Sequence, residues 1–129
     1  MNVRTEVVDF TDAKGDAKIL DVATGTGKQA FAFGKRGYKV VGIDLSEHML
    51  KVAARKNKYG NVGFILADAA KLPFMDQHFD VCSISFALHE MPLSMRKEVL
   101  QEIVRVTRIG GTIMIIDYSS SSEKRIGGY

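Results

Sequence analysis

The sequence predicts an α/β protein with a Rossmann-like, doubly wound and mostly parallel sheet. Two observations lead to this prediction. Short β-branched runs alternate with segments of helical spacing along the 129 residues. Most of these runs are continuously apolar, which is typical of parallel strands buried on both faces. The repeated strand–helix–strand order implies right-handed crossovers within one sheet. Because the chain has no internal repeat and no boundary, residues 1–129 are expected to form a single domain.

Five strands and three helices are predicted in chain order. The expected strands are Lys18–Ala23, Lys39–Leu45, Val62–Asp68, Val81–Phe86 and Thr112–Tyr118. The expected helices are Lys28–Lys35, Glu47–Lys58 and Met95–Thr107. Ser46 and Ser94 precede the second and third helices as candidate N-caps, and Gly110-Gly111 is expected to end the third. The segment Ala69–Asp80 contains Pro73 and little apolar periodicity, so it is expected to be mostly loop.

Composition and charge exclude several classes of protein. The apolar run Ile113–Ile116 is far too short to cross a bilayer, so no integral membrane segment is expected. The net charge of +3 comes from scattered Lys and Arg residues, which argues against a nucleic-acid partner. Cys82 has no second cysteine to pair with and predicts a reducing, cytoplasmic location. The three histidines show no metal-ligand spacing, so no metal is expected.

A glycine-rich turn follows the first predicted strand. Gly25 and Gly27 permit a tight turn, and the helix beginning near Lys28 points its positive end at any ligand bound there. A P-loop is excluded, because Val22 and Gln29 occupy positions that require glycine and Ser or Thr. The pattern Gly25-x-Gly27-x-x-Ala30 fits the permissive dinucleotide-binding fingerprint, which keeps an NAD-dependent oxidoreductase as one alternative.

Three carboxylates end the first three predicted strands. Asp21, Asp44 and Asp68 are therefore expected around one crevice at the carboxyl edge of the sheet. Asp44 lies 17 residues after Gly27, where an acid can accept both hydroxyls of a ribose. Asp68 and the N–H of Ala69 could read an adenine edge. This set suits a ligand that carries an adenosine, an ammonium group and a sulfonium better than it suits a pyrophosphate.

Five blocks of sequence resemble the class I S-adenosylmethionine-dependent methyltransferases. The similarity is greatest to the methyltransferase type 11 or ubiquinone/menaquinone biosynthesis methyltransferase family, and it covers about residues 17–119. The blocks are residues 19–27 (ILDVATGTG), 41–50 (VGIDLSEHML), 67–74 (ADAAKLPF), 79–89 (FDVCSISFALH) and 105–111 (RVTRIGG). Two positions depart from the family pattern: Ala23 replaces a common glycine, and Ile109 replaces a common proline.

The resemblance implies a cofactor, S-adenosylmethionine, and a set of residues that bind it. Gly25, Thr26 and Gly27 would hold its methionine end through the backbone, with Asp21 supporting the amino group. Ser85 would lie beside the same end. The residues implied for the adenosine are Asp44 for the ribose hydroxyls, Leu45 for packing on adenine, and Asp68 and Ala69 for the adenine edge.

The sequence predicts methyl transfer to a small or lipid-like acceptor but no definite catalytic residue. In-line transfer from a sulfonium mainly requires positioning and the exclusion of water. His89-Glu90 and Tyr118 follow the fourth and fifth predicted strands and are candidates to face the methyl group. Asp80 and Cys82 are expected to be structural. A module that binds the cofactor without transfer remains a second alternative.

The last predicted strand, Thr112–Tyr118, is an apolar edge as the sequence stands. Only 11 residues, Ser119–Tyr129, follow it. Natural proteins avoid leaving such an edge open, because its unpaired backbone groups can pair with another chain. The sequence therefore predicts either a chain truncated at both ends, lacking the last antiparallel strands of the sheet, or a homodimer that covers this edge.

Overall fold

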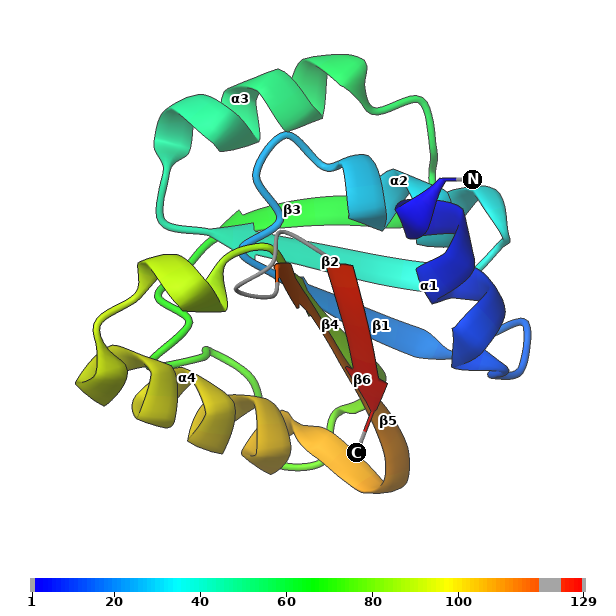
Figure 1. Cartoon of the computed structure of the whole chain (residues 1–129). Helices are drawn as coiled ribbons and strands as arrows, with labels where there is room; N and C mark the ends of the chain where they lie inside the picture. The colour runs from blue at the N-terminus through cyan, green and yellow to red at the C-terminus, as the bar shows by residue number, and fades with distance from the viewer. Residues whose placement is uncertain (1, 119–123, 129) are drawn as a thin grey trace.

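A computed structural model describes residues 2–118 and 124–128 of the chain (Figure 1). These residues form a six-stranded sheet in the order β3-β2-β1-β4-β5-β6. The strands are β1 Lys18–Val22, β2 Lys39–Asp44, β3 Val62–Leu66, β4 Phe79–Ser85, β5 Thr107–Tyr118 and β6 Lys124–Gly128. The helices are α1 Val3–Thr11, α2 Lys28–Lys35, α3 Glu47–Lys56, the 3-10 helix η1 Leu88–Glu90, and α4 Leu93–Val106.

The first five strands are parallel, and strand order reverses between β1 and β4. Helices cover both faces, with α1 and α2 on one side and α4 on the other (Figure 1). On the α1–α2 side, Val8 and Phe33 pack with Ile19 of β1 in one core. On the α4 side, Ile103 packs with Leu20 of the same strand in a second core. Alternate residues of β1 thus serve opposite cores, which confirms the predicted doubly wound α/β fold.

Several element boundaries differ from the prediction. Helix α1, with Asn2 as its N-cap, was not predicted, although Val3, Val7 and Val8 follow helical spacing. Ser46 caps α3 as predicted, because its Oγ accepts the Met49 N–H at 3.2 Å. Ser94 does not cap α4, which begins at Leu93 after Pro92. Residues 69–78 of the predicted loop Ala69–Asp80 lie outside helices and strands, whereas Phe79 and Asp80 already belong to β4.

Gly110-Gly111 lies inside β5 rather than between a helix and a strand. The β4–β5 register shifts between Phe79, which pairs with Thr107, and Val81, which pairs with Thr112. The extra residues form a bulge in which Gly110 has a φ of 83°. A Cβ on Gly111 would lie 2.6 Å from the Asp80 carbonyl oxygen, so the close approach of the two strands requires glycine there.

The expectation that the sheet lacks its antiparallel strands is wrong for β6. This strand pairs antiparallel with β5, from Met114 opposite Gly128 to Tyr118 opposite Lys124. Its backbone groups pair with those of the β5 edge, which would otherwise be left open. The reason for expecting a homodimer at that edge is therefore removed.

Within the described residues, no helix is both long and apolar enough to cross a membrane.

Candidate functional site

A pocket of about 270 Å³ lies where β1 and β4 end, at the point where strand order reverses. In open α/β sheets this point is the usual ligand site. Four predicted site residues line the pocket: Asp21, Gly25, Thr26 and Ser85. The remaining lining residues are Arg4, Ala23, Thr24, Lys28, Gln29, Met49 and Phe86.

Asp21 is the most deeply buried acid of the pocket, with 1% of its surface exposed. The hydroxyls of Thr24 and Ser83 donate to its two carboxylate oxygens, each at 2.8 Å. Burial raises the pKa of Asp21 to about 6, and the two hydroxyl hydrogen bonds counter only part of that effect. An unbalanced buried carboxylate of this kind favours a cationic ligand nearby.

The turn between β1 and α2 has a left-handed backbone at three positions. Ala23, Gly25 and Gly27 have φ values of 56°, 58° and 91°. A Cβ on Gly27 would lie 2.9 Å from the Phe64 ring and 3.0 Å from Phe31, so this position requires glycine for two reasons. Ala23 adopts a conformation that L-residues disfavour, at the position where the sequence departs from the family glycine.

Asp44 positions this turn from the neighbouring strand β2. Its Oδ2 accepts the Gly25 N–H at 2.8 Å, and its Oδ1 accepts the Ser46 N–H at 2.9 Å. Each oxygen retains a lone pair for a further donor. Leu45, the next residue, is 65% exposed, so its side chain is available to a ligand.

Gly27 belongs to the turn but does not line the 270 Å³ pocket, and neither do Asp44, Leu45, Asp68 and Ala69. These last four residues lie at the ends of β2 and β3, on the other side of β1 from Ser85. Asp68 is exposed and accepts the Ala70 N–H at 2.9 Å, whereas Ala69 is buried. The predicted set therefore divides into a pocket at β1 and β4 and a more open surface at β2 and β3.

Two buried oxygens of the pocket lack a hydrogen-bond partner among the described residues: Gln29 Oε1 and Ser85 Oγ. Gln29 is 2% exposed, and its amide nitrogen donates to the Arg4 carbonyl at 3.1 Å, which ties α2 to α1. Buried polar atoms are nearly always paired, so both oxygens indicate a missing donor. A ligand carrying N–H groups would supply it.

Arg4 and Phe86 were missed by the sequence analysis. Arg4 comes from α1, and its guanidinium carbon lies 5.7 Å from the centre of the Phe86 ring. The Asn2 N-cap and the apolar spacing of α1 could have revealed this helix. Phe86 has a φ of 58°, an uncommon conformation for an aromatic residue, and no sequence signal predicts it.

His89, which follows β4, forms a pair with Asp117, near the end of β5. His89 Nδ1 lies 2.5 Å from Asp117 Oδ1, and the His89 N–H donates to Asp117 Oδ2 at 3.0 Å. Asp117 follows Ile116, the residue that pairs with Ser85, so the pair lies at the same edge as the pocket. Tyr118, the other predicted candidate, ends β5, and its side chain lies outside the described part of the structure.

Asp80 and Cys82 lie away from the pocket. Asp80, near the amino end of β4, accepts the Lys18 N–H at 2.8 Å and pairs with Arg108 at 2.5 Å. Cys82 is fully buried in β4, and burial raises the pKa of its thiol to about 12. No cluster of three or more His, Cys, Asp and Glu that could hold a metal ion occurs in the described ranges.

Comparison with known proteins places this geometry in a family. The family described as "Methyltransferase domain" matches residues 19–111. The chain belongs to this family. The structure also resembles the YcgJ protein from Bacillus subtilis with a TM-score of 0.81 and 25% identity, over 89% of this chain and 50% of that one. The family and the structural likeness confirm the predicted methyltransferase fold.

Curated relatives carry quinone-biosynthesis names. A demethylmenaquinone methyltransferase of Paenarthrobacter aurescens is 41% identical, over 90% of this chain and 44% of that protein. A ubiquinone/menaquinone biosynthesis C-methyltransferase of Azotobacter vinelandii is 33% identical, over 93% of this chain and 49% of that protein. The chain thus spans about half the length of these relatives. The comparisons favour neither an NAD-dependent oxidoreductase nor a module without transfer.

Proposed function

We propose that the protein binds S-adenosylmethionine at the carboxyl ends of β1, β2 and β3 and the end of β4, and transfers its methyl group to a lipid-like acceptor. The unpartnered buried oxygens Gln29 Oε1 and Ser85 Oγ carry this proposal. The methionine end of the cofactor has an ammonium group that can donate to such oxygens. It also has a carboxylate, which suits the Arg4 guanidinium and the N-terminus of α2.

The residues of the 270 Å³ pocket would hold the methionine end. Asp21 would stabilise the ammonium group at close range, because its hydrogen bonds come only from hydroxyls and the Arg4 charge acts on it from beyond ion-pair distance. Thr26 and the backbone around Gly25 and Gly27 would enclose the carboxylate side of the methionine end. The volume is below the roughly 300–1,000 Å³ typical of clefts for whole drug-sized ligands, which is consistent with a pocket for one end of the cofactor.

The adenosine would lie on the more open surface at β2 and β3. Asp44 would accept the ribose hydroxyls with the lone pairs that Gly25 and Ser46 leave available. Leu45 is exposed and would pack on the adenine. Asp68 and Ala69 would contact the adenine edge, as the resemblance implies.

We propose a quinone precursor such as demethylmenaquinone as the acceptor, because curated relatives bear that name. When bound, the cofactor supplies a methyl group on a positively charged sulfur, which keeps the bonding electron pair when the methyl group leaves. A ring carbon of the hydroquinone form that gains the methyl group must lose its proton. The chain therefore needs a proton acceptor at this edge of the sheet.

His89 is the group that we assign to this proton. Asp117 Oδ1 lies 2.5 Å from Nδ1 of the imidazole, which favours the tautomer with its proton on Nδ1 and its lone pair on Nε2. Nε2 lies 3.8 Å from Glu90 Oε1. The proton from the acceptor would pass to Nε2. Asp117 would act as a positioning residue through the ring, as carboxylates do in other histidine–carboxylate pairs.

We also propose that residues 1–129 act as one domain and that the protein is located in the cytoplasm. The single cysteine, Cys82, is buried and has no second cysteine to pair with, which supports a reducing compartment.

Calorimetry with S-adenosylhomocysteine, the product form of the cofactor, tests the binding site. We expect binding to the wild-type chain and about fivefold weaker binding to Ser85→Ala, because one hydrogen bond is lost. Ser94→Ala, at the exposed start of α4, is the matched control and should bind as wild type. Tight binding of NAD with none of S-adenosylhomocysteine would overturn the proposal.

Methyl transfer is tested separately, with labelled S-adenosylmethionine and demethylmenaquinone reduced to the hydroquinone. We expect His89→Gln to lose at least tenfold in rate, with cofactor binding unchanged. Asp117→Asn should lose less, because the imidazole itself is kept. A chain that binds the cofactor yet transfers no methyl group to any quinol would be a binding module.

A further inference from the structure

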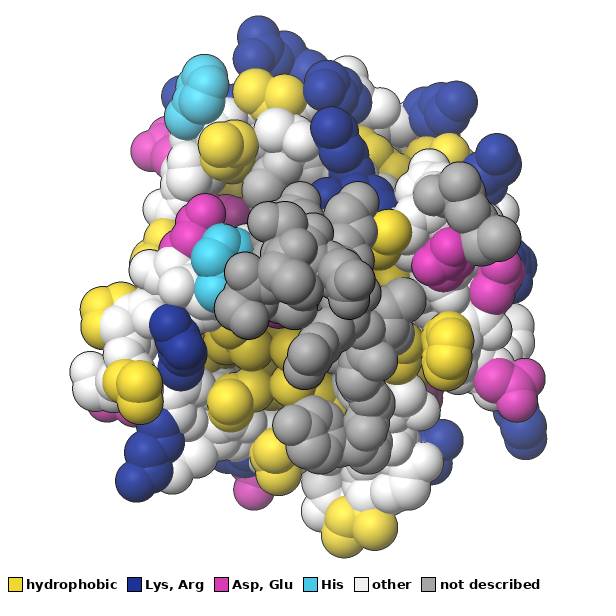
Figure 2. Space-filling view, viewed as in Figure 1, with side chains coloured by type: hydrophobic (Ala, Val, Ile, Leu, Met, Phe, Trp, Pro, Cys, Tyr) yellow, Lys and Arg dark blue, Asp and Glu magenta, His cyan; other side chains and the backbone are white. Residues whose placement is uncertain are grey.

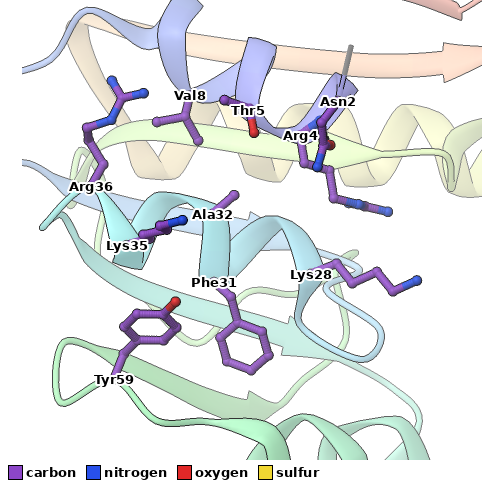
Figure 3. Close-up of a pocket in the computed structure, with 10 residues that line it drawn as sticks. All are labelled: Asn2, Arg4, Thr5, Val8, Lys28, Phe31, Ala32, Lys35, Arg36 and Tyr59. Carbon is purple, nitrogen blue, oxygen red and sulfur yellow. The ribbon is translucent and has the colours of Figure 1, made fainter.

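A second, larger hollow of about 670 Å³ lies between α1 and α2 (Figure 3). It adjoins the 270 Å³ pocket, because Arg4 and Lys28 line both. We call this hollow the α1–α2 cleft. Its lining residues are Asn2, Arg4, Thr5, Val8, Lys28, Phe31, Ala32, Lys35, Arg36 and Tyr59. Four of the ten are cationic and none is acidic.

The helical repeat explains why these side chains face one another. Lys28 and Lys35 are seven residues apart, two turns of α2, so they lie on one stripe with Phe31 and Ala32 between them. On α1, Arg4 and Val8 are one turn apart. Figure 3 shows the two stripes facing across the α1–α2 cleft, with Arg4 and Lys28 extending toward the same end.

One wall of the α1–α2 cleft is aromatic. The Phe31 and Tyr59 ring centres are 5.8 Å apart, and both rings lie on the side away from α1 (Figure 3). The Lys58 ammonium lies 5.8 Å from the centre of the Tyr59 ring, which adds a fifth cation at the rim. The cleft therefore combines an apolar wall with a cationic margin.

Most of this positive charge is not neutralised within the protein. Arg36 pairs with Asp9 at 2.5 Å. No ion pair within 4.0 Å joins Arg4, Lys28 or Lys35 to an acid in the part of the chain that the structure describes. On the other side of the sheet, by contrast, Arg105 is bound by two acids, Asp76 and Glu102. Figure 2 likewise shows Lys and Arg side chains gathered where Figure 1 places the start of α2.

We infer that the α1–α2 cleft binds the phosphate headgroup of an anionic lipid and so holds the protein on a membrane surface. The ammonium groups of Lys28 and Lys35 suit phosphate oxygens. The two guanidinium groups of the cleft are engaged elsewhere, Arg36 with Asp9 and Arg4 with the carboxylate end of the proposed cofactor. Tyr59 and Phe31 suit the glycerol and first methylenes of the same lipid, since aromatic rings favour the membrane interface. The choice of a lipid rests on the proposed function, because a quinone acceptor resides in the bilayer. A nucleic acid suits the cleft less well, because the cations surround a hollow rather than forming a stripe.

Vesicle co-sedimentation of the whole chain tests the inference. We expect binding to vesicles of phosphatidylcholine with phosphatidylglycerol, weakening with added salt, and no binding to phosphatidylcholine alone. Lys35→Gln should weaken binding about fivefold, the effect of one cation at an anionic surface. Lys97→Gln, which removes the same charge from an exposed position on α4, should bind as wild type.

Other outcomes would overturn the lipid assignment. Equal loss of vesicle binding in Lys35→Gln and Lys97→Gln would show that the attraction depends on net charge and not on the α1–α2 cleft. No binding to vesicles that contain phosphatidylglycerol would exclude the lipid. Binding of inorganic phosphate without vesicle binding would identify a free-phosphate site. Tighter binding of single-stranded DNA, lost in Lys35→Gln, would identify a nucleic-acid site. Lys35 does not line the 270 Å³ pocket, so S-adenosylhomocysteine affinity measured on the same variants tests the proposed function independently.

Discussion

The two ends of the central strands β1 and β4 differ in the partners that they provide for a carboxylate. At the amino end, Asp80 accepts a backbone N–H from Lys18 and pairs with the Arg108 guanidinium. At the carboxyl end, Asp21 is almost fully buried and receives only two hydroxyl hydrogen bonds, from Thr24 and Ser83. A carboxylate with a cation is satisfied within the fold, whereas Asp21 retains a charge that the protein leaves unbalanced.

The backbone does not show the same contrast, because residues with positive φ occur at both ends. At the amino end, Asp12 before β1 and Gln77 before β4 have φ values of 41° and 52°, and Gly110 of the bulge has a φ of 83°. At the carboxyl end, two residues with side chains, Ala23 and Phe86, adopt positive φ at the ends of β1 and β4. Such conformations cost about 1–2 kcal/mol each and cluster at functional sites. The comparison therefore teaches that the two ends differ in how their carboxylates are balanced, whereas backbone strain occurs at both ends.

The largest expected effect is the pH dependence of stability that Asp21 imposes. Its pKa is raised from 3.8 to about 6, so between these values the folded chain binds the proton more tightly than the unfolded chain does. The stabilising contribution is complete below about pH 4 and is lost as the pH rises through 6, by up to about 3 kcal/mol. Urea unfolding of the cofactor-free chain between pH 4.5 and 7.5 measures it.

Asp21→Asn isolates this contribution, because the other carboxylates titrate alike in both proteins. We expect the wild type to lose free energy of unfolding relative to Asp21→Asn as the pH rises. A constant difference across the range would show that Asp21 is charged throughout.

The second effect separates binding from stability. We expect Asp44→Asn to weaken S-adenosylhomocysteine binding about tenfold, because one charged acceptor for the ribose and for Gly25 is lost. Asp80→Asn should instead lower the free energy of unfolding by about 1 kcal/mol and leave the affinity unchanged. Calorimetry and urea unfolding of both variants measure the two effects. Equal loss of affinity in both would contradict the division between the two ends.

The smallest effect concerns the strained turn. Ala23→Gly should raise the free energy of unfolding by about 0.5 kcal/mol. The relief of backbone strain at φ 56° outweighs the extra conformational entropy that glycine gives to the unfolded chain. Ala70→Gly is the control: Ala70 is not among the positive-φ residues, so glycine should destabilise there by a similar amount. Thermal unfolding of both variants, compared at one pH, measures the difference. Destabilisation by Ala23→Gly would contradict strain at this turn.

Local patterns determined much of the fold. The five parallel strands, α2, α3, α4 and the loop before β4 follow from apolar runs and helical spacing. The glycine turn and the acids at the strand ends were predicted in the same way, because strand ends and turns leave direct marks in the sequence. The bulge at Gly110-Gly111 was not predicted, since it depends on the closeness of β4 and β5.

The sequence by itself determined the fold class, the family and the acids and glycines at the strand ends, because periodicity and short motifs are local properties of the chain. The tertiary structure decided which residues meet. It brought Arg4 of α1 to Asp21 and Phe86, left Gln29 Oε1 and Ser85 Oγ without donors, joined His89 to Asp117, and closed the β5 edge with β6. These contacts join residues distant in the chain, and burial, charge balance and strand pairing arise only when the layers have packed.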